Sequence, residues 1–177
     1  MKAKWIGLVI VAAAVAAACG EGHAIFNVDV FSFMQGTGDD TLHYTVPGNT
    51  SGNVDNPPVE FQLLGGLGNS TVDTVTITIG ADLDNNTGTG TVSYQIFFSD
   101  SQSTTYNGPP FLTANGNLTP GNTTPIVATA TFSDSLFNAQ SLWVGIRLGA
   151  AATTATALDG TMRLTALNLR IVLQDKF

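Results

Sequence analysis

Residues 74–79, TVTITI, alternate a threonine with a β-branched aliphatic residue at every step. Side chains on an extended strand point to opposite faces in turn, so this stretch has one polar and one apolar face. The same alternation recurs at 92–98, 126–132 and 142–148. One buried and one solvent-facing side is typical of antiparallel sheets, so the pattern predicts an all-β fold.

Four further stretches read as strands, and they are separated from the others by Gly, Asn and Pro. They are residues 25–34, 42–46, 59–64 and 162–173. In the last one the apolar residues move from even to odd positions near Ala166-Leu167, which predicts a β-bulge. Eight or nine strands of this kind predict an antiparallel β-sandwich, jelly-roll-like, over residues 25–177. A closed β-barrel is the alternative.

Two long connections, 47–58 and 99–125, are expected to be loops, and loops on a rigid scaffold often carry binding sites. Tyr106 and Phe111 lie in the second loop, and the alternation places Trp143 on the outward side of its strand. Exposed aromatic rings are stacking platforms for sugars. The sequence therefore offers Trp143, Tyr106 and Phe111 as ligand-binding candidates, with packing of Trp143 beneath a loop as the alternative.

The N-terminus has the composition of an export signal. Lys2 and Lys4 precede an uncharged apolar run over residues 6–18 that ends in small residues. A membrane-spanning helix needs about 20 apolar residues, so this shorter run predicts a signal peptide over residues 1–18.

Residues 15–20, VAAACG, resemble the lipobox of bacterial lipoproteins, although Ala16 stands where that family usually has leucine. The resemblance implies that Cys19 becomes the lipidated N-terminus, carrying a diacylglyceryl thioether and an acyl chain such as palmitate. Residues 19–24 would then tether the domain to the membrane. By the family's sorting rule, Gly20 implies the outer membrane of the cell envelope, with the periplasmic or surface face left open. Ordinary cleavage, leaving Cys19 unlipidated, is the alternative.

Charge limits the partners. Loss of residues 1–18 removes Lys2 and Lys4, leaving four basic against thirteen acidic residues and a net charge of −9. No Lys or Arg lies between Trp5 and Ile146. Phosphate backbones are bound by Lys and Arg, so nucleic acid is not an expected partner.

The acidic stretch from Asp82 to Gly88 is expected to be a loop between two strands. Oxygen ligands at alternate positions, Asp82, Asp84 and Asn86, resemble the opening of a calcium-binding loop. Calcium prefers six to eight oxygen ligands, so it is the one candidate cofactor. A polar hairpin loop without metal is the alternative.

Catalysis has little support. His43 is the one histidine beyond the tether, and no G-x-S-x-G motif is present. The sequence predicts a non-catalytic, lipid-anchored envelope protein that binds or scaffolds a protein, a polysaccharide or a cation. A structural subunit of a larger envelope assembly is the alternative, with outward Phe97, Val127 and Trp143 at its interface. A carbohydrate-active enzyme ranks third.

Overall fold

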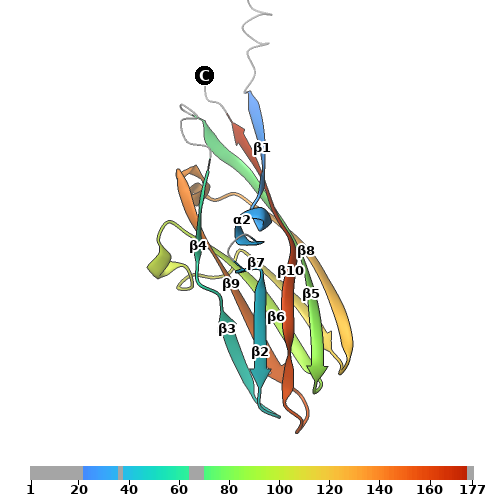
Figure 1. Ribbon diagram of the computed structural model, residues 1–177. Coiled ribbons are helices and arrows are strands. Elements are labelled where there is room, and N and C mark those ends of the chain that lie inside the picture. The colour runs from blue at the N-terminus through green and yellow to red at the C-terminus, as the bar shows by residue number, and fades with distance from the viewer. Residues whose placement is uncertain (1–21, 36–37, 64–69, 175–177) are drawn as a thin grey trace, which may run out of the picture.

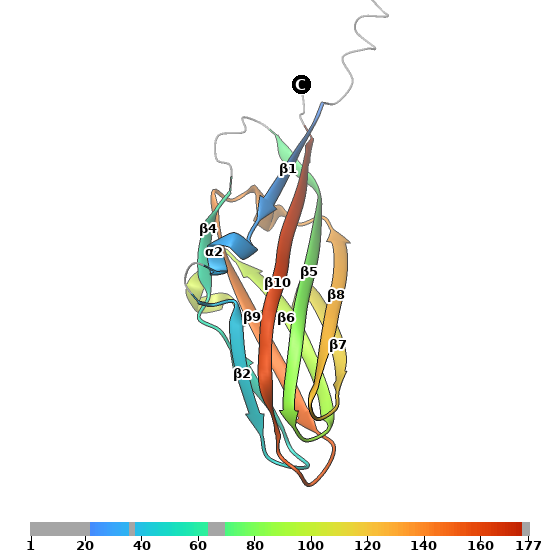
Figure 2. The ribbon, with the colours of Figure 1, turned by 45° about the vertical axis from the view of Figure 1, so that its right-hand side comes forward.

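The protein is a β-sandwich of two five-stranded antiparallel sheets packed face to face (Figures 1 and 2). The computed structural model describes residues 22–35, 38–63 and 70–174. The predicted sandwich is confirmed, and these described residues contain ten strands instead of the expected eight or nine. The described strands pair into two separate sheets, so the alternative of a closed barrel is wrong.

The first sheet is built around two long strands that pair along most of their length. These two strands are β5 and β10, and β8 pairs with the other edge of β5. On the other edge of β10, β1 pairs with the C-terminal half of β10 and β2 pairs with its N-terminal part. The strands are β1 (His23–Asp29), β2 (Thr41–Val46), β5 (Thr71–Thr87), β8 (Asn122–Phe132) and β10 (Leu158–Gln174).

The second sheet has the order β3-β9-β6-β7, and β4 also pairs with β9. Its strands are β3 (Ser51–Asp55), β4 (Val59–Gln62), β6 (Gly90–Ser99), β7 (Leu112–Leu118) and β9 (Ser141–Ala152). We call the side of each sheet that faces away from the other sheet its outer face.

The apolar sides of the strands meet between the sheets. Ile77 and Ile79 of the opening stretch are 0 % exposed, as are Ile146 and Leu148 of β9. Complete burial of such a side chain contributes about 1.5–3 kcal/mol each. The alternation that predicted the fold is therefore the alternation that forms the core.

Three expected loops contain strand. β3 lies in 47–58, β7 lies in 99–125, and β5 continues through the acidic stretch to Thr87. Glycine and asparagine have low strand propensity, but here their backbones complete ladders with β9, β6 and β10. In the 99–125 connection the longest stretch outside the sheets is the segment before β7, and it includes the 3₁₀ helix η1 (Gln102–Thr104). A second 3₁₀ helix, η2 (Ser135–Asn138), precedes β9.

The expected strand 25–34 ends early. After Asp29 the chain turns into the short helix α2 (Phe31–Gln35), where Ser32 N–H donates to Asp29 Oδ1 over 3.3 Å. Met34 of this helix is fully buried. The predicted bulge in β10 is confirmed, because the register with β5 shifts between Leu164 and Ala166.

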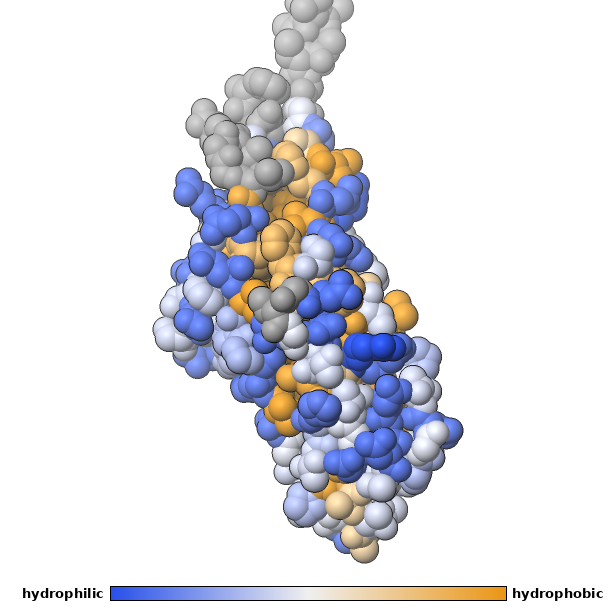
Figure 3. Space-filling view, viewed as in Figure 1, coloured by the Kyte–Doolittle hydropathy of each residue, from blue (hydrophilic) through white to orange (hydrophobic). Residues whose placement is uncertain are grey.

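Hydrophobic residues gather on the surface around α2, between β1 and β4, whereas the far end of the molecule is mostly polar (Figure 3). Phe33 on α2 is 51 % exposed and Ile25 on β1 is 52 % exposed. β1 and the last residues of β10 pair side by side, so both ends of the described chain lie at this end of the sandwich (Figure 1).

Candidate functional site

A groove crosses the outer face of the second sheet. The strand register aligns two rows of residues across four strands, from β3 through β9 and β6 to β7. One row is Asn53, Gly149, Ser93 and Asn115; the next is Ser51, Ala151, Thr91 and Asn117. With Gly52, Gly116, Val92 and Ala150, these residues line an open hollow of about 410 Å³. The groove is therefore formed by four strands and not by a loop.

The polar side chains of the groove have no hydrogen-bond partners among the described residues. Within the described residues, none of the side chains of Asn53, Asn115 and Asn117 forms a hydrogen bond with the protein. The hydroxyls of Ser93 and Thr91 lie between them and are equally unpaired there. An amide can donate two hydrogen bonds and accept two, so the groove presents many unused donors and acceptors.

An ion pair borders the groove on one side. Arg147 lies two residues before Gly149 on the same face of β9, and its Nε and Nη2 donate to the two carboxylate oxygens of Asp55 over 2.7 and 2.8 Å. Hydrogen bonding of the Arg147 side chain to Asp55 raises the pKa of Arg147. The guanidinium also lies 4.9 Å from the ring centre of Tyr106 and 5.2 Å from that of Phe97, within cation–π range.

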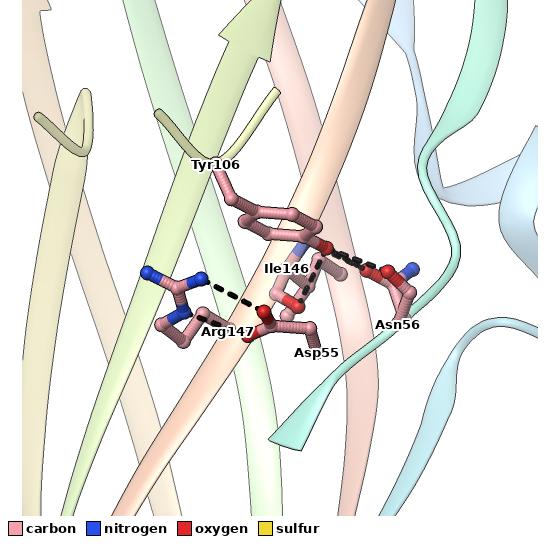
Figure 4. A network of polar contacts seen from close by, with 5 residues as sticks. All are labelled: Asp55, Asn56, Tyr106, Ile146 and Arg147. Carbon is pink, nitrogen blue, oxygen red and sulfur yellow. Dashed lines mark hydrogen bonds and ion pairs between the residues drawn. The ribbon is translucent and has the colours of Figure 1, made fainter. Parts of the chain in front are cut away.

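Tyr106 attaches the segment before β7 to the sheet (Figure 4). Its hydroxyl lies 2.6 Å from the backbone oxygen of Asn56, 2.9 Å from Asn56 Oδ1 and 3.1 Å from the backbone oxygen of Ile146. Asn56 Oδ1 also accepts from Ile146 N–H over 2.7 Å. Burial first, and then the nearby Asp55 carboxylate, raise the pKa of Tyr106, so it stays protonated and able to donate.

This attachment changes the expected surface. Phe97, predicted to face outward as an interface residue, is only 2 % exposed because it lies in edge-to-face contact with Tyr106, at 5.2 Å between ring centres. Val127 does face solvent, with 78 % of its surface exposed, and Trp143 is partly buried. Phe97 is thus a local packing residue of the second sheet.

The three aromatic residues predicted to bind ligand occupy different environments. Phe111 packs into the interior against Phe98 and Phe137, at 5.6 and 5.8 Å between ring centres. Tyr106 and Trp143 lie on the outer face of the second sheet, and no ring contact joins any two of the three within the described residues. The structure therefore does not assemble them into one stacking surface.

The predicted calcium ligands lie on a strand. Asp82, Asp84 and Asn86 follow one another on one side of β5, and each has a protein partner. Asp82 lies 3.6 Å from Arg163, Asp84 accepts from Thr123, and Asn86 donates to Asp159 over 3.1 Å. Among the described residues, no group of three or more His, Cys, Asp or Glu side chains could hold a metal ion. Calcium binding stays a prediction.

A second hollow, of about 500 Å³, lies beside the segment before β7 and includes Phe111. Its polar groups are mostly used by the segment itself. Ser99 Oγ and Thr104 Oγ1 are 2.7 Å apart, Thr105 Oγ1 donates to Ser101 O over 3.1 Å, and Asp134 accepts from Leu136 N–H. The groove is therefore the better candidate for ligand binding, because its polar groups are free.

Cys19 and the signal segment lie outside the described residues. Among the described residues, no helix is both long and apolar enough to cross a bilayer.

Comparison with known proteins gives only distant likenesses. No family model and no curated protein matches the chain. Among solved structures, infectious bursal disease virus of the Gt strain is 7 % identical with a TM-score of 0.38, over 86 % of this chain and 39 % of that one. Eiger TNF from S. frugiperda is 11 % identical with a TM-score of 0.34, over 75 % and 92 %. TmCBM61 in complex with beta-1,4-galactotriose is 10 % identical with a TM-score of 0.31, over 84 % and 89 %. The chain spans less than two fifths of the length of the virus chains. Scores at this level carry no argument about function.

Sequence reasoning missed the groove residues. Asn53 and Asn115 fall in the two connections expected to be loops, 47–58 and 99–125. Residues 51, 53, 115 and 117 are polar at every second position, which was a usable strand pattern. Their meeting on one face, however, depends on a pairing register that no local pattern specifies.

Proposed function

We propose that this protein is an exported cell-envelope protein, held to the membrane by lipid on Cys19, whose β-sandwich binds a ligand in the groove without catalysing a reaction. The observation that carries the binding role is the set of unpaired amide and hydroxyl groups that four strands hold in register. The sheet fixes the backbone positions from which these side chains project, so the backbone needs little reorganisation when a ligand binds, and this preorganisation favours affinity.

The absence of catalysis in this proposal rests on the chemistry of the groove. Amide and hydroxyl side chains line it, and the nearest charged groups, Arg147 and Asp55, neutralise each other. The ring of His43 lies on the first sheet instead, where its Nδ1 is 3.0 Å from Thr161 Oγ1. The groove therefore brings together no acid and base that could exchange a proton with a ligand.

The anchor is tested with Cys19→Ser. We expect wild-type protein to incorporate labelled palmitate and to sediment with membranes, and the variant to be unlabelled and released. A variant that stays membrane-bound contradicts the anchor but leaves the groove hypothesis unaffected.

The groove is tested with Ser93→Trp. A tryptophan at this position would lie over Gly149, fill the groove and suit the strand backbone. Thr131→Trp is the matched control, because Thr131 lies exposed on the outer face of the first sheet. We expect envelope material from the producing organism to bind the wild type and Thr131→Trp, and not Ser93→Trp. Equal binding to all three proteins would contradict a ligand site in the groove.

A structural subunit is the second candidate, favoured by the exposure of Val127 on β8. If the protein polymerises through this face, Val127→Asp should lower the molar mass measured by light scattering at high protein concentration. A wild type that is monomeric under those conditions would contradict this candidate.

A further inference from the structure

The groove lacks charge along its floor. Its lining residues are asparagine, serine, threonine, glycine, alanine and one valine, and the charged pair beside it, Asp55 with Arg147, is bidentate. Charged ligands need a complementary charge to repay the loss of their hydration. The groove offers none, so its chemistry favours a neutral ligand.

The hydrogen-bonding groups specify a ligand that both donates and accepts. Asn53 lies near one end of its row, Ser93 in the middle and Asn115 at the other end. Amides and hydroxyls each donate and accept, and a sugar hydroxyl does the same. A polyhydroxylated ligand could therefore pair with every group along the row.

The shape specifies an extended ligand. Neighbouring strands lie about 4.8 Å apart, so the four strands span about 14 Å from β3 to β7. β3 and β7 are the outermost strands of this path, so no further strand in the described part of the chain closes either end. A groove that is open at both ends accepts the interior of a long chain and not only its terminus.

A peptide fits this surface less well. Extended peptides usually add to a sheet through backbone hydrogen bonds at an edge strand. The groove lies on a sheet face, where the backbone groups of β9 and β6 are already paired with each other and with their other neighbours. Only side chains are available to a ligand there.

We infer that the groove binds a neutral polysaccharide, with the chain running across the strands from β3 to β7. This inference rests on the proposed binding function and names its ligand class. Asn53 and Asn115 contact opposite parts of the chain, and Gly149 between them keeps the floor low enough for a sugar ring to approach the backbone.

The test uses soluble mature protein and a panel of linear neutral oligosaccharides (glucans, galactans and mannans), with uronic-acid oligosaccharides of equal length as the charged comparison. Binding is measured by titration calorimetry for the wild type, for Asn53→Ala with Asn115→Ala, and for Asn168→Ala. Asn168 is the matched control, because it is an exposed asparagine on the outer face of the first sheet.

We expect at least one neutral oligosaccharide to bind the wild type. Each lost hydrogen bond should weaken binding about fivefold, so the double variant should lose roughly 25-fold and Asn168→Ala less than twofold. Absence of neutral binding, stronger binding of the uronic-acid series, or an unchanged double variant would each overturn the inference.

Binding assays with protease-treated and periodate-treated envelope material distinguish this inference from the proposed function. If binding to the groove resists protease and is destroyed by periodate, which cleaves the vicinal diols of sugars, the ligand is a polysaccharide. If protease destroys binding and periodate does not, the groove is a binding site but the ligand class is wrong. If Ser93→Trp binds the material as the wild type does, both proposals fail.

Discussion

The three tyrosine hydroxyls differ in their hydrogen bonding, and this difference predicts the stability of the three Tyr→Phe variants. The Tyr106 hydroxyl has acceptors at 2.6, 2.9 and 3.1 Å. The Tyr44 hydroxyl has one, the backbone oxygen of Asp84, at 3.4 Å. The Tyr94 hydroxyl is fully buried and has no hydrogen-bond partner among the described residues.

The magnitudes follow from these contacts. Loss of the Tyr106 hydroxyl removes a net hydrogen bond and leaves buried backbone oxygens less satisfied, so Tyr106→Phe should lower the free energy of unfolding by about 1–2 kcal/mol. For a domain of this size, this change lowers Tm by about 2–8 °C. Burial of an unpaired hydroxyl such as that of Tyr94 costs about 1–3 kcal/mol, so its removal should stabilise the fold. The small void left behind offsets part of this stabilisation. Tyr94→Phe should therefore be neutral or stabilising by up to about 1 kcal/mol, with Tyr44→Phe between the other two.

Urea unfolding of the mature domain measures this order. Trp143 is the single tryptophan after residue 18 and reports by fluorescence from β9, the strand that Tyr106 contacts. The midpoint should move while the m-value stays constant, because the surface exposed on unfolding is unchanged. If Tyr94→Phe lowered the free energy of unfolding as much as Tyr106→Phe, the reasoning would be refuted. The number of hydrogen bonds to each hydroxyl would then not determine the order of stability among the variants.

Three further predictions address other parts of the molecule. Hydrogen bonds from Asn86, and then from Thr45, lower the pKa of Asp159. The stability that Asp159 contributes is therefore present above about pH 4, the ordinary pKa of an aspartate, and is lost as the pH falls through the lowered pKa. Asp159→Asn should thus flatten the acid side of the curve of stability against pH, and parallel curves would contradict this. A Cβ on Gly145 would lie 2.7 Å from Tyr106 Cζ, so Gly145→Ala should displace the segment before β7 and speed its proteolysis, and unchanged cleavage rates would count against the attachment. If Asp82 and Asp84 bind calcium, millimolar Ca²⁺ should raise Tm relative to chelator, and an equal Tm would end that prediction.

The sequence predicted the sandwich because its strongest strands carry an alternation that burial requires. Residues 74–79 and 142–148 lie where the pattern placed them, and the bulge near Ala166 follows from a phase change visible in the chain. The pattern was weaker where glycine and asparagine replaced β-branched residues. β3 and β7 are strands because β9 and β6 supply their partners, and this tertiary contribution is absent from local propensity.

The candidate site was beyond local reasoning for a related reason. Asn53 and Asn115 are separated by 62 positions in the chain, and two intervening strands align them. Reasoning from single residues favoured aromatic rings, yet Phe111 is partly buried against the core and Tyr106 attaches the segment before β7 to the sheet. Polar residues of moderate size became the candidate site because the sheet left them unpaired.

The two glycines on the outer side of β9 show why the groove is more than an unfilled surface. Glycine weakens a strand, so its presence in the centre of a sheet needs a cause. Gly145 has one within the fold, because Thr105 and Tyr106 approach it so closely that a side chain would collide with both. Gly149 has no comparable neighbour: a Cβ there would meet only the tip of the Asn53 side chain at 3.0 Å and the strand of Ser93 beyond 3.5 Å. Nothing in the packing of the described residues requires glycine at position 149, whereas the proposed ligand, which approaches the floor between Asn53 and Asn115, would account for it.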